Sequence, residues 1–167
     1  AGGQATARGG GGDVVSDAQA PLPAPVAQAL PAAATQGVER LDAQLLLLHA
    51  LGRTSDERAW LLAHDNDPLA ADLAERFQQH LRRRLAGEPV AYLLGEKEFH
   101  GLALQVDARV LVPRPDTETL VDWAIECLHG LHEVRVMDLG TGSGAIALAL
   151  QKARPDLQIH AVDASQD

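Results

Sequence analysis

Three glycines stand at every second position in residues 140–144, between a short apolar run and an apolar helical pattern. Glycine adopts positive φ and lets a ligand approach the backbone closely. The first turn of a following helix offers unpaired N–H groups. Asp163 ends the next apolar stretch, where a carboxylate commonly accepts hydrogen bonds from ribose hydroxyls. These residues predict a site for a cofactor that carries adenosine.

The identity of that cofactor depends on the residues at the two ends of the loop. Ala145 completes the dinucleotide pattern G-x-G-x-x-G/A, so a NAD(P) site stays open. Asp138 places a negative charge two residues before the first glycine. A diphosphate would be repelled there, whereas the sulfonium and ammonium of S-adenosylmethionine would tolerate it. The loop therefore favours S-adenosylmethionine, with a dinucleotide site and a purely structural loop as alternatives.

Other residues whose types could take part in catalysis or metal binding have simpler interpretations. Ser143 has no histidine–aspartate partners in evidence and is interpreted as a loop residue. His129 and His132 lack the cysteine or carboxylate pattern that completes a metal site, so we expect surface histidines and no metal. Glu118 falls in the first turn of an expected helix, where the dipole favours an acid, and it stays a candidate pocket residue.

The spacing of apolar residues on either side of the glycine loop predicts a strand, a helix and a strand, in the order of a βαβ unit. We expect a strand at residues 134–138, a helix at 145–154 and a parallel strand at 158–162. A helix capped by Asp116 precedes them, with Trp123 packed inward and Cys127 half buried. Before this helix, the pattern of residues 99–106 predicts a hairpin and residues 110–112 another extended piece.

Residues 37–95 read as a small helical bundle. Leucines recur at helical spacing, and Gly52, Gly87 and Gly95 are expected to end helices. Ser55 is expected to cap a second helix that packs Trp60 inward. Asp67 and Pro68 are expected to open a third helix, as a cap and the first helical residue.

Composition sets the outer limits on fold and partners. Residues 1–36 are rich in Gly, Ala and Pro and predict a flexible extension, with at most a short helix at 26–30. The net charge is −9, of which residues 96–167 carry −6, so direct binding of nucleic acid is not expected. A single cysteine, no membrane-length apolar run and no secretory signal make a cytoplasmic protein the default expectation.

Three segments in order carry a resemblance to a known family: GEPVAYLLGEKEFHG (87–101), LVPRPDTETLVDWA (111–124) and VMDLGTGSGAIALAL (136–150). Together they resemble the HemK/PrmC family of peptide-chain release-factor glutamine methyltransferases, over residues 38–167. The resemblance implies an α/β fold with three parts. A helical substrate-docking domain (37–95) is followed by a hairpin linker and the first βαβ part of a truncated, Rossmann-like class I methyltransferase domain (96–167).

The resemblance also implies site residues, matched one by one. The amino-acid part of S-adenosylmethionine would be held by residues of the loop, and Asp163 would hold the ribose. The loop residues are Gly140, Thr141, Gly142, Ser143 and Gly144. Weaker pocket candidates are Phe99, Arg114, Pro115, Thr117, Glu118 and Asp138.

The implied reaction is methyl transfer to the glutamine amide nitrogen in the Gly-Gly-Gln motif of a class I release factor. The family's Asn-Pro-Pro-Tyr motif, which would orient that amide, is absent from the 167 residues. We therefore expect an N-terminal piece of an enzyme that is inactive by itself, with catalytic residues beyond residue 167. Gly2-Gly3-Gln4 matches the target tripeptide but is interpreted as chance in a biased segment.

Three alternatives stay open. One is a related glutamine methyltransferase that acts on a ribosomal protein. The second is a NAD(P)-dependent oxidoreductase. The third is a binding module without catalysis, in which the helical bundle docks a release factor.

Overall fold

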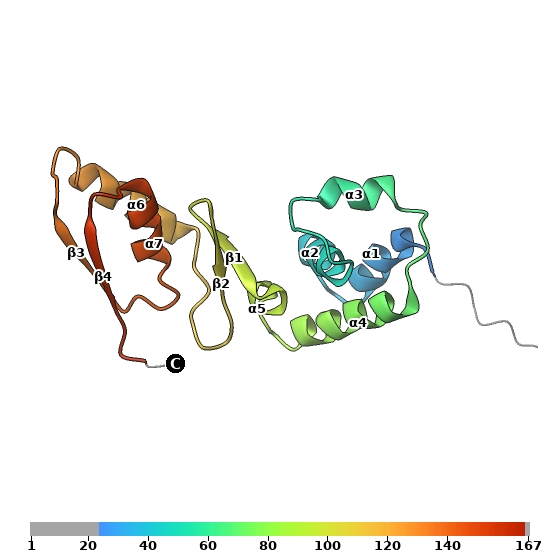
Figure 1. Cartoon of the computed structure of the whole chain (residues 1–167). Coiled ribbons are helices and arrows are strands. Elements are labelled where there is room, and N and C mark those ends of the chain that lie inside the picture. Colours follow the sequence, from blue (N-terminus) through green and yellow to red (C-terminus); the bar gives the residue numbers. More distant parts are fainter. Residues whose placement is uncertain (1–23, 166–167) are drawn as a thin grey trace, which may run out of the picture.

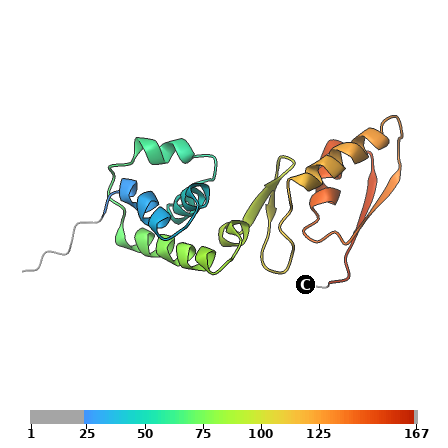
Figure 2. The same cartoon turned by 180° about the vertical axis from the view of Figure 1, so that it is seen from behind.

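The computed structural model describes residues 24–165, and Gly2-Gly3-Gln4 lies outside them. Two views show an elongated chain with a helical part at one end and a βαβ part at the other (Figures 1 and 2). A short hairpin lies between them. Of the described helices, none is both long enough and apolar enough to cross a membrane.

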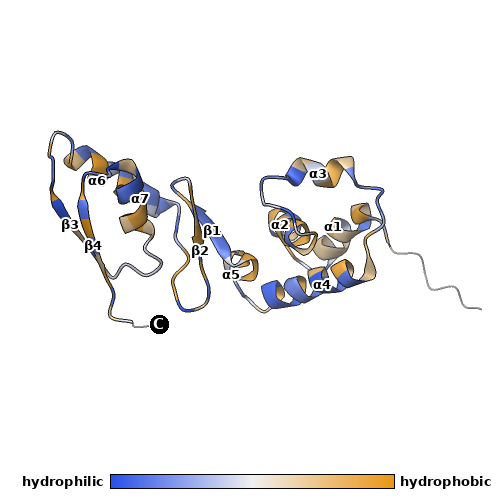
Figure 3. Ribbon diagram, in the orientation of Figure 1, coloured by the Kyte–Doolittle hydropathy of each residue, from blue (hydrophilic) through white to orange (hydrophobic). Residues whose placement is uncertain are grey.

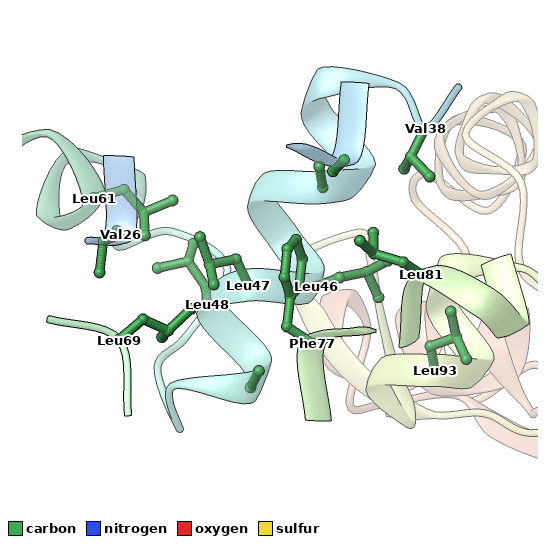
Figure 4. Packing of buried hydrophobic residues seen from close by; sticks show 13 residues of the cluster. Val26, Val38, Leu46, Leu47, Leu48, Leu61, Leu69, Phe77, Leu81 and Leu93 are labelled. Atoms are coloured by element: carbon green, nitrogen blue, oxygen red, sulfur yellow. The ribbon is translucent and has the colours of Figure 1, made fainter. Parts of the chain in front are cut away.

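Five helices and their loops form the first part. Their bounds are α1 Val26–Thr35, α2 Arg40–Ala50, α3 Arg58–Ala63, α4 Ala71–Leu85 and α5 Val90–Leu94. Hydrophobic residues run along α2, whereas much of α4 is hydrophilic (Figure 3). The apolar face of α4 is therefore narrow. Phe77 and Leu81 of that face are buried against α2, which contributes Leu46, Leu47 and Leu48 to the same core (Figure 4).

The short helix expected at residues 26–30 is present as α1, which continues to Thr35. The expected flexible extension is wrong for this segment, because α1 belongs to the helical core. Val26 and Ala33 are 3% and 0% exposed within the same cluster as Leu61 and Leu69. The first two N–H groups of α1 donate to the carbonyls of Asp67 and Asp65, which satisfies donors that a helix start leaves open. Packing by residues more than 25 positions away thus orders a segment whose own composition favours disorder.

Two expected helix starts are also wrong. Pro68 does not open α4, which begins at Ala71, because Pro68 forms an antiparallel bridge with Pro25. Ser55 does not cap α3, which begins at Arg58 after a turn in which the Glu57 carboxylate accepts from the Thr54 N–H at 2.9 Å. The expected ends are confirmed: Gly52, Gly87 and Gly95 follow α2, α4 and α5 with positive φ.

The hairpin and the βαβ unit follow as the sequence predicts. Strands β1 (Glu96–Phe99) and β2 (Leu102–Gln105) pair antiparallel, and β3 (Arg135–Leu139) pairs in parallel with β4 (Gln158–Val162). Helix α6 (Asp116–Cys127) precedes β3, and α7 (Ala145–Ala153) joins the two parallel strands. Residues 110–112, expected to be extended, form no strand. Asp116 is the first residue of α6 and makes no capping bond.

A second core joins the hairpin to the βαβ unit. Phe99 and Leu104 of the hairpin are buried with Val121 of α6 and Ala149 of α7. One face of the parallel pair stays open: Met137, Leu139 and Val162 are 62%, 73% and 47% exposed. Parallel sheets are normally covered on both faces. The βαβ unit is therefore under-packed, which is expected for a parallel sheet of only two strands.

Two side chains of α6 lie elsewhere than expected. Trp123 is 61% exposed rather than packed, and Cys127 is exposed rather than half buried. Val121 of α6 is buried and Ala124 and Ile125 are partly buried, on the helix face whose apolar residues recur at helical spacing. Trp60, by contrast, packs against the helical core as predicted, with the Arg53 guanidinium 3.9 Å from the centre of its ring.

A histidine pair makes the stability of the helical core depend on pH. The rings of His49 (α2) and His80 (α4) lie 5.2 Å apart, between two helices of the core. Burial lowers the pKa of both side chains below 6.5, with further contributions from Arg76 to His49 and from His49 to His80. The unfolded chain therefore binds more protons than the folded one below about pH 6.5.

We expect the free energy of unfolding to be largest above pH 6.5 and to fall as the pH drops below it. Urea unfolding at pH 7.5 and 5.5 measures this. The variant with His49→Gln and His80→Gln should lose most of the difference, while His129→Gln, at an exposed position, should keep it. An equal difference in the double variant and the parent chain would contradict the assignment.

Candidate functional site

The glycine loop folds back onto the end of β4. The N–H groups of Gly140 and Thr141 both donate to the carbonyl of Val162, at 2.8 and 3.1 Å. All three glycines of the loop have positive φ, of 74°, 52° and 77° in chain order. Residues with a Cβ rarely adopt this conformation, so the loop has the shape that its glycines predict.

Asp163 lies directly against this loop. Its Oδ2 accepts a hydrogen bond from the Gly142 N–H at 2.9 Å, and its Oδ1 accepts from the Ser165 N–H at 2.9 Å. The N–H groups of Ser165 and Gly142 lower the pKa of this carboxyl. Each oxygen keeps acceptor capacity, because a carboxylate has about four lone-pair sites. An ionised, exposed carboxylate at this point can accept from the hydroxyls of a sugar.

Asp138 and Thr141 form the opposite end of the loop. The Thr141 hydroxyl donates to Asp138 Oδ2 at 2.8 Å, and Asp138 is half-buried at the end of β3. This bond uses one of the carboxylate's acceptor sites and leaves its charge in place. The two carboxylates give the loop a negative surrounding, which suits a cation better than a diphosphate.

The start of α7 adds donors to the same site. Within residues 24–165, the N–H groups of Ser143, Ala145, Ile146 and Ala147 have no hydrogen-bond partner. Such groups at a helix start favour an anion such as a carboxylate. An amino acid that carries a cationic group and a carboxylate would therefore suit this site. Its cation would lie near Asp138 and Asp163, and its carboxylate near the N–H groups at the start of α7.

Phe99 is fully buried rather than open to a ligand. Its side chain is 1% exposed in the core cluster that also contains Ala145, the first residue of α7. The hairpin aromatic is thus brought to the helix that starts at the glycine loop.

The residues of the 114–118 segment point to different surroundings. Arg114 and Pro115 line an open groove of about 1310 Å³ between the helical part and the hairpin. No residue of the glycine loop lines this groove. Thr117 lies half-buried in the first turn of α6. Glu118 Oε1 accepts from the backbone N–H of His100 at 3.3 Å, so it faces the hairpin turn.

Sequence reasoning missed a set of polar side chains around that turn. His100 Nε2 lies 3.0 Å from Asp122 Oδ1, and Lys152 Nζ donates to the Gly101 carbonyl at 2.8 Å. The spacing of four between Glu118 and Asp122 places both on one face of a helix and was a visible signal. No local pattern pointed to Lys152.

Histidines and cysteines supply no metal centre in the part of the chain that the structure describes. No group of three or more His, Cys, Asp or Glu side chains gathers there. His129 and His132 are exposed, as predicted for surface histidines.

Comparison with known proteins identifies both parts of the chain. Residues 24–95 match the PrmC N-terminal domain, and residues 117–167 match the methyltransferase small domain. A protein of Xylella fastidiosa named release factor glutamine methyltransferase is 50% identical over 144 residues, which are 86% of this chain and 50% of that protein. Proteins of the same name from Bordetella pertussis and Escherichia coli are 49% and 45% identical over 79% and 77% of the chain.

The fold and the site thus define a methyltransferase-type α/β unit preceded by a helical domain. The chain belongs to the HemK/PrmC family. It spans about half the length of the curated relatives it matches.

Proposed function

We propose that the chain provides the cofactor loop and the substrate-docking domain of a release-factor glutamine methyltransferase. The reaction is S-adenosylmethionine-dependent methylation of the glutamine amide in the Gly-Gly-Gln motif of a class I release factor. The observation that carries the proposal is the 50% identity to a release factor glutamine methyltransferase over 86% of the chain.

S-adenosylmethionine supplies the methyl group as a sulfonium. Residues of this chain would hold its two ends. The free N–H groups of Ser143 and the first turn of α7 would bind the carboxylate, and Asp163 would accept from the ribose hydroxyls. Asp138 would place its negative charge near the cationic part.

Transfer to an amide nitrogen is a problem of position. The lone pair of an amide is delocalised into the carbonyl, and no ordinary general base restores it. Holding the nitrogen in line with the methyl group and excluding water contributes to the rate without a general base. The nitrogen–carbon bond would form as the sulfur–carbon bond breaks, and the nitrogen would then lose one proton to solvent. The family resemblance implies an Asn-Pro-Pro-Tyr motif for this step, and the 167 residues contain none. We therefore propose that the chain by itself does not transfer methyl groups.

Binding of the protein partner separates a release factor from a ribosomal protein as the substrate. The full chain should bind a class I release factor in a calorimetric titration and bind the ribosomal-protein substrate at least tenfold more weakly, about 1.4 kcal/mol. Mixed with the release factor and methyl-labelled S-adenosylmethionine, it should transfer no label above buffer. Tighter binding of the ribosomal protein would favour that substrate, and transfer of label would contradict the inactivity of the chain.

A further inference from the structure

The turn of the β1–β2 hairpin is held by charged side chains from two helices of the βαβ part. The turn consists of His100 and Gly101, both with positive φ, of 48° and 71°. Glu118 of α6 accepts from the His100 N–H, and Lys152 of α7 donates to the Gly101 carbonyl.

Two further bonds tighten the same turn. The His100 ring lies 3.0 Å from Asp122 Oδ1, and the Gly101 N–H donates to Glu98 Oε1 at 2.7 Å. A methyl group added to Gly101 would lie 3.1 Å from Lys152 Nζ, so the ammonium lies close over the turn. Exposed charge pairs stabilise little individually, but three bonds from α6 and α7 to two residues define the position of the turn closely.

The hairpin in turn is joined to the helical part through α5. This helix has five residues, yet Leu93 is buried in the helical core and Ala91 in the core shared by the hairpin and the βαβ unit. Gly95 ends α5 and β1 begins at the next residue. The Tyr92 hydroxyl donates to the Val110 carbonyl at 2.6 Å, which ties α5 to the segment after the hairpin. A change in the angle of the hairpin is therefore passed to the helical part.

Apolar and polar contacts hold the hairpin in different ways. Burial of Phe99 and Leu104 keeps the hairpin attached but is non-directional. Bonds at the turn, at the far end from α5, fix its angle. Lys152 lies on the helix that begins at the glycine loop, so the turn is positioned relative to that loop.

We propose that Glu118, Asp122 and Lys152 are positioning residues, which clamp the hairpin turn and thereby fix the orientation of the helical domain relative to the glycine loop. This clamping of the turn does not depend on the reaction. Its role in aligning a docked substrate with the methyl donor rests on the proposed function.

A distance measurement between spin labels tests the clamp without cofactor or substrate. One label is placed on the native Cys127 of α6 and the other on Gln79→Cys, an exposed position of α4. The disrupting variant combines Glu118→Ala and Asp122→Ala with Lys152→Met. The conservative variant combines Glu118→Gln with Lys152→Arg, which keep an acceptor and a donor. Thr119→Ala, next to Glu118 and exposed, is the matched control.

We expect the disrupting variant to widen the distance distribution roughly twofold, because the turn is then held by non-directional contacts alone. The conservative variant and the control should keep the parent width, and circular dichroism should show the same secondary structure in all four proteins. An unchanged width in the disrupting variant would overturn the proposal. Equal widening in the conservative variant or in Thr119→Ala would also overturn it.

Discussion

Replacing Phe77 by alanine is expected to lower the free energy of unfolding of the helical part by about 3–5 kcal/mol. The ring is 1% exposed and lies beside Leu46, with Leu81 one turn further along α4 (Figure 4). The loss combines the transfer of the ring out of water with the cavity left between α2 and α4. α4 has few apolar residues, so it has little other means of packing.

Urea unfolding followed by the fluorescence of Trp60 measures this change, because Trp60 packs against the same core. Trp123→Phe removes the signal of the βαβ part. Leu62→Ala, at a side chain 74% exposed, is the control and should change the free energy by no more than about 0.5 kcal/mol. A loss below about 1 kcal/mol for Phe77→Ala would show that the core is not packed as described.

Replacing Asp163 by alanine is expected to weaken S-adenosylmethionine binding about tenfold or more. Hydrogen bonds to a charged group contribute about 1.5–3 kcal/mol, and about 1.4 kcal/mol corresponds to a factor of ten. The change removes the acceptor that we propose for the ribose and also releases the Gly142 N–H from its bond to Asp163. The backbone N–H groups that lower the pKa of this carboxyl keep it charged at neutral pH.

Two further variants separate the causes of that loss. Asp163→Asn keeps an acceptor oxygen without the charge and should bind with intermediate affinity. Asp107→Ala removes an exposed acid paired with Arg109, away from the loop in sequence, and should bind like the parent chain. Calorimetry measures all three, and parent-like affinity in Asp163→Ala would remove this residue from the site.

The sequence predicted the parts whose signals are local. The hairpin, the βαβ unit and the glycines after α2, α4 and α5 follow from patterns within a few residues. The glycine loop and its contact with Asp163 also follow, because successive parallel strands place their ends at one edge of the sheet.

The misses depend on contacts between distant segments. α1 contains Pro31 and many alanines, and it is ordered by packing against Leu61 and Leu69. Asp67 and Pro68 look like a helix start, yet their backbone pairs with the residues before and within α1. Helical spacing predicts the face of α6 that Val121, Ala124 and Ile125 turn to the core. Trp123 lies outside that face, so its apolar ring alone is not evidence of packing.

The clamp on the hairpin turn illustrates the same limit within the site. Glu118 and Asp122 share a helix face that can be read from their spacing, but Lys152 and His100 are 52 positions apart. Only the fold brings α7 to the turn. Glu118 therefore looked like a residue of the cofactor pocket, while its bond is to the hairpin.

Titration of the isotopically labelled chain with S-adenosylmethionine and, separately, with NAD tests whether the glycine loop binds a sulfonium cofactor. The amide signals of residues 140–147 report binding at the loop. We predict that S-adenosylmethionine shifts these signals in a saturable way and that NAD at the same concentrations does not. Shifts caused by NAD, with no response to S-adenosylmethionine, would contradict the assignment of the glycine loop to S-adenosylmethionine.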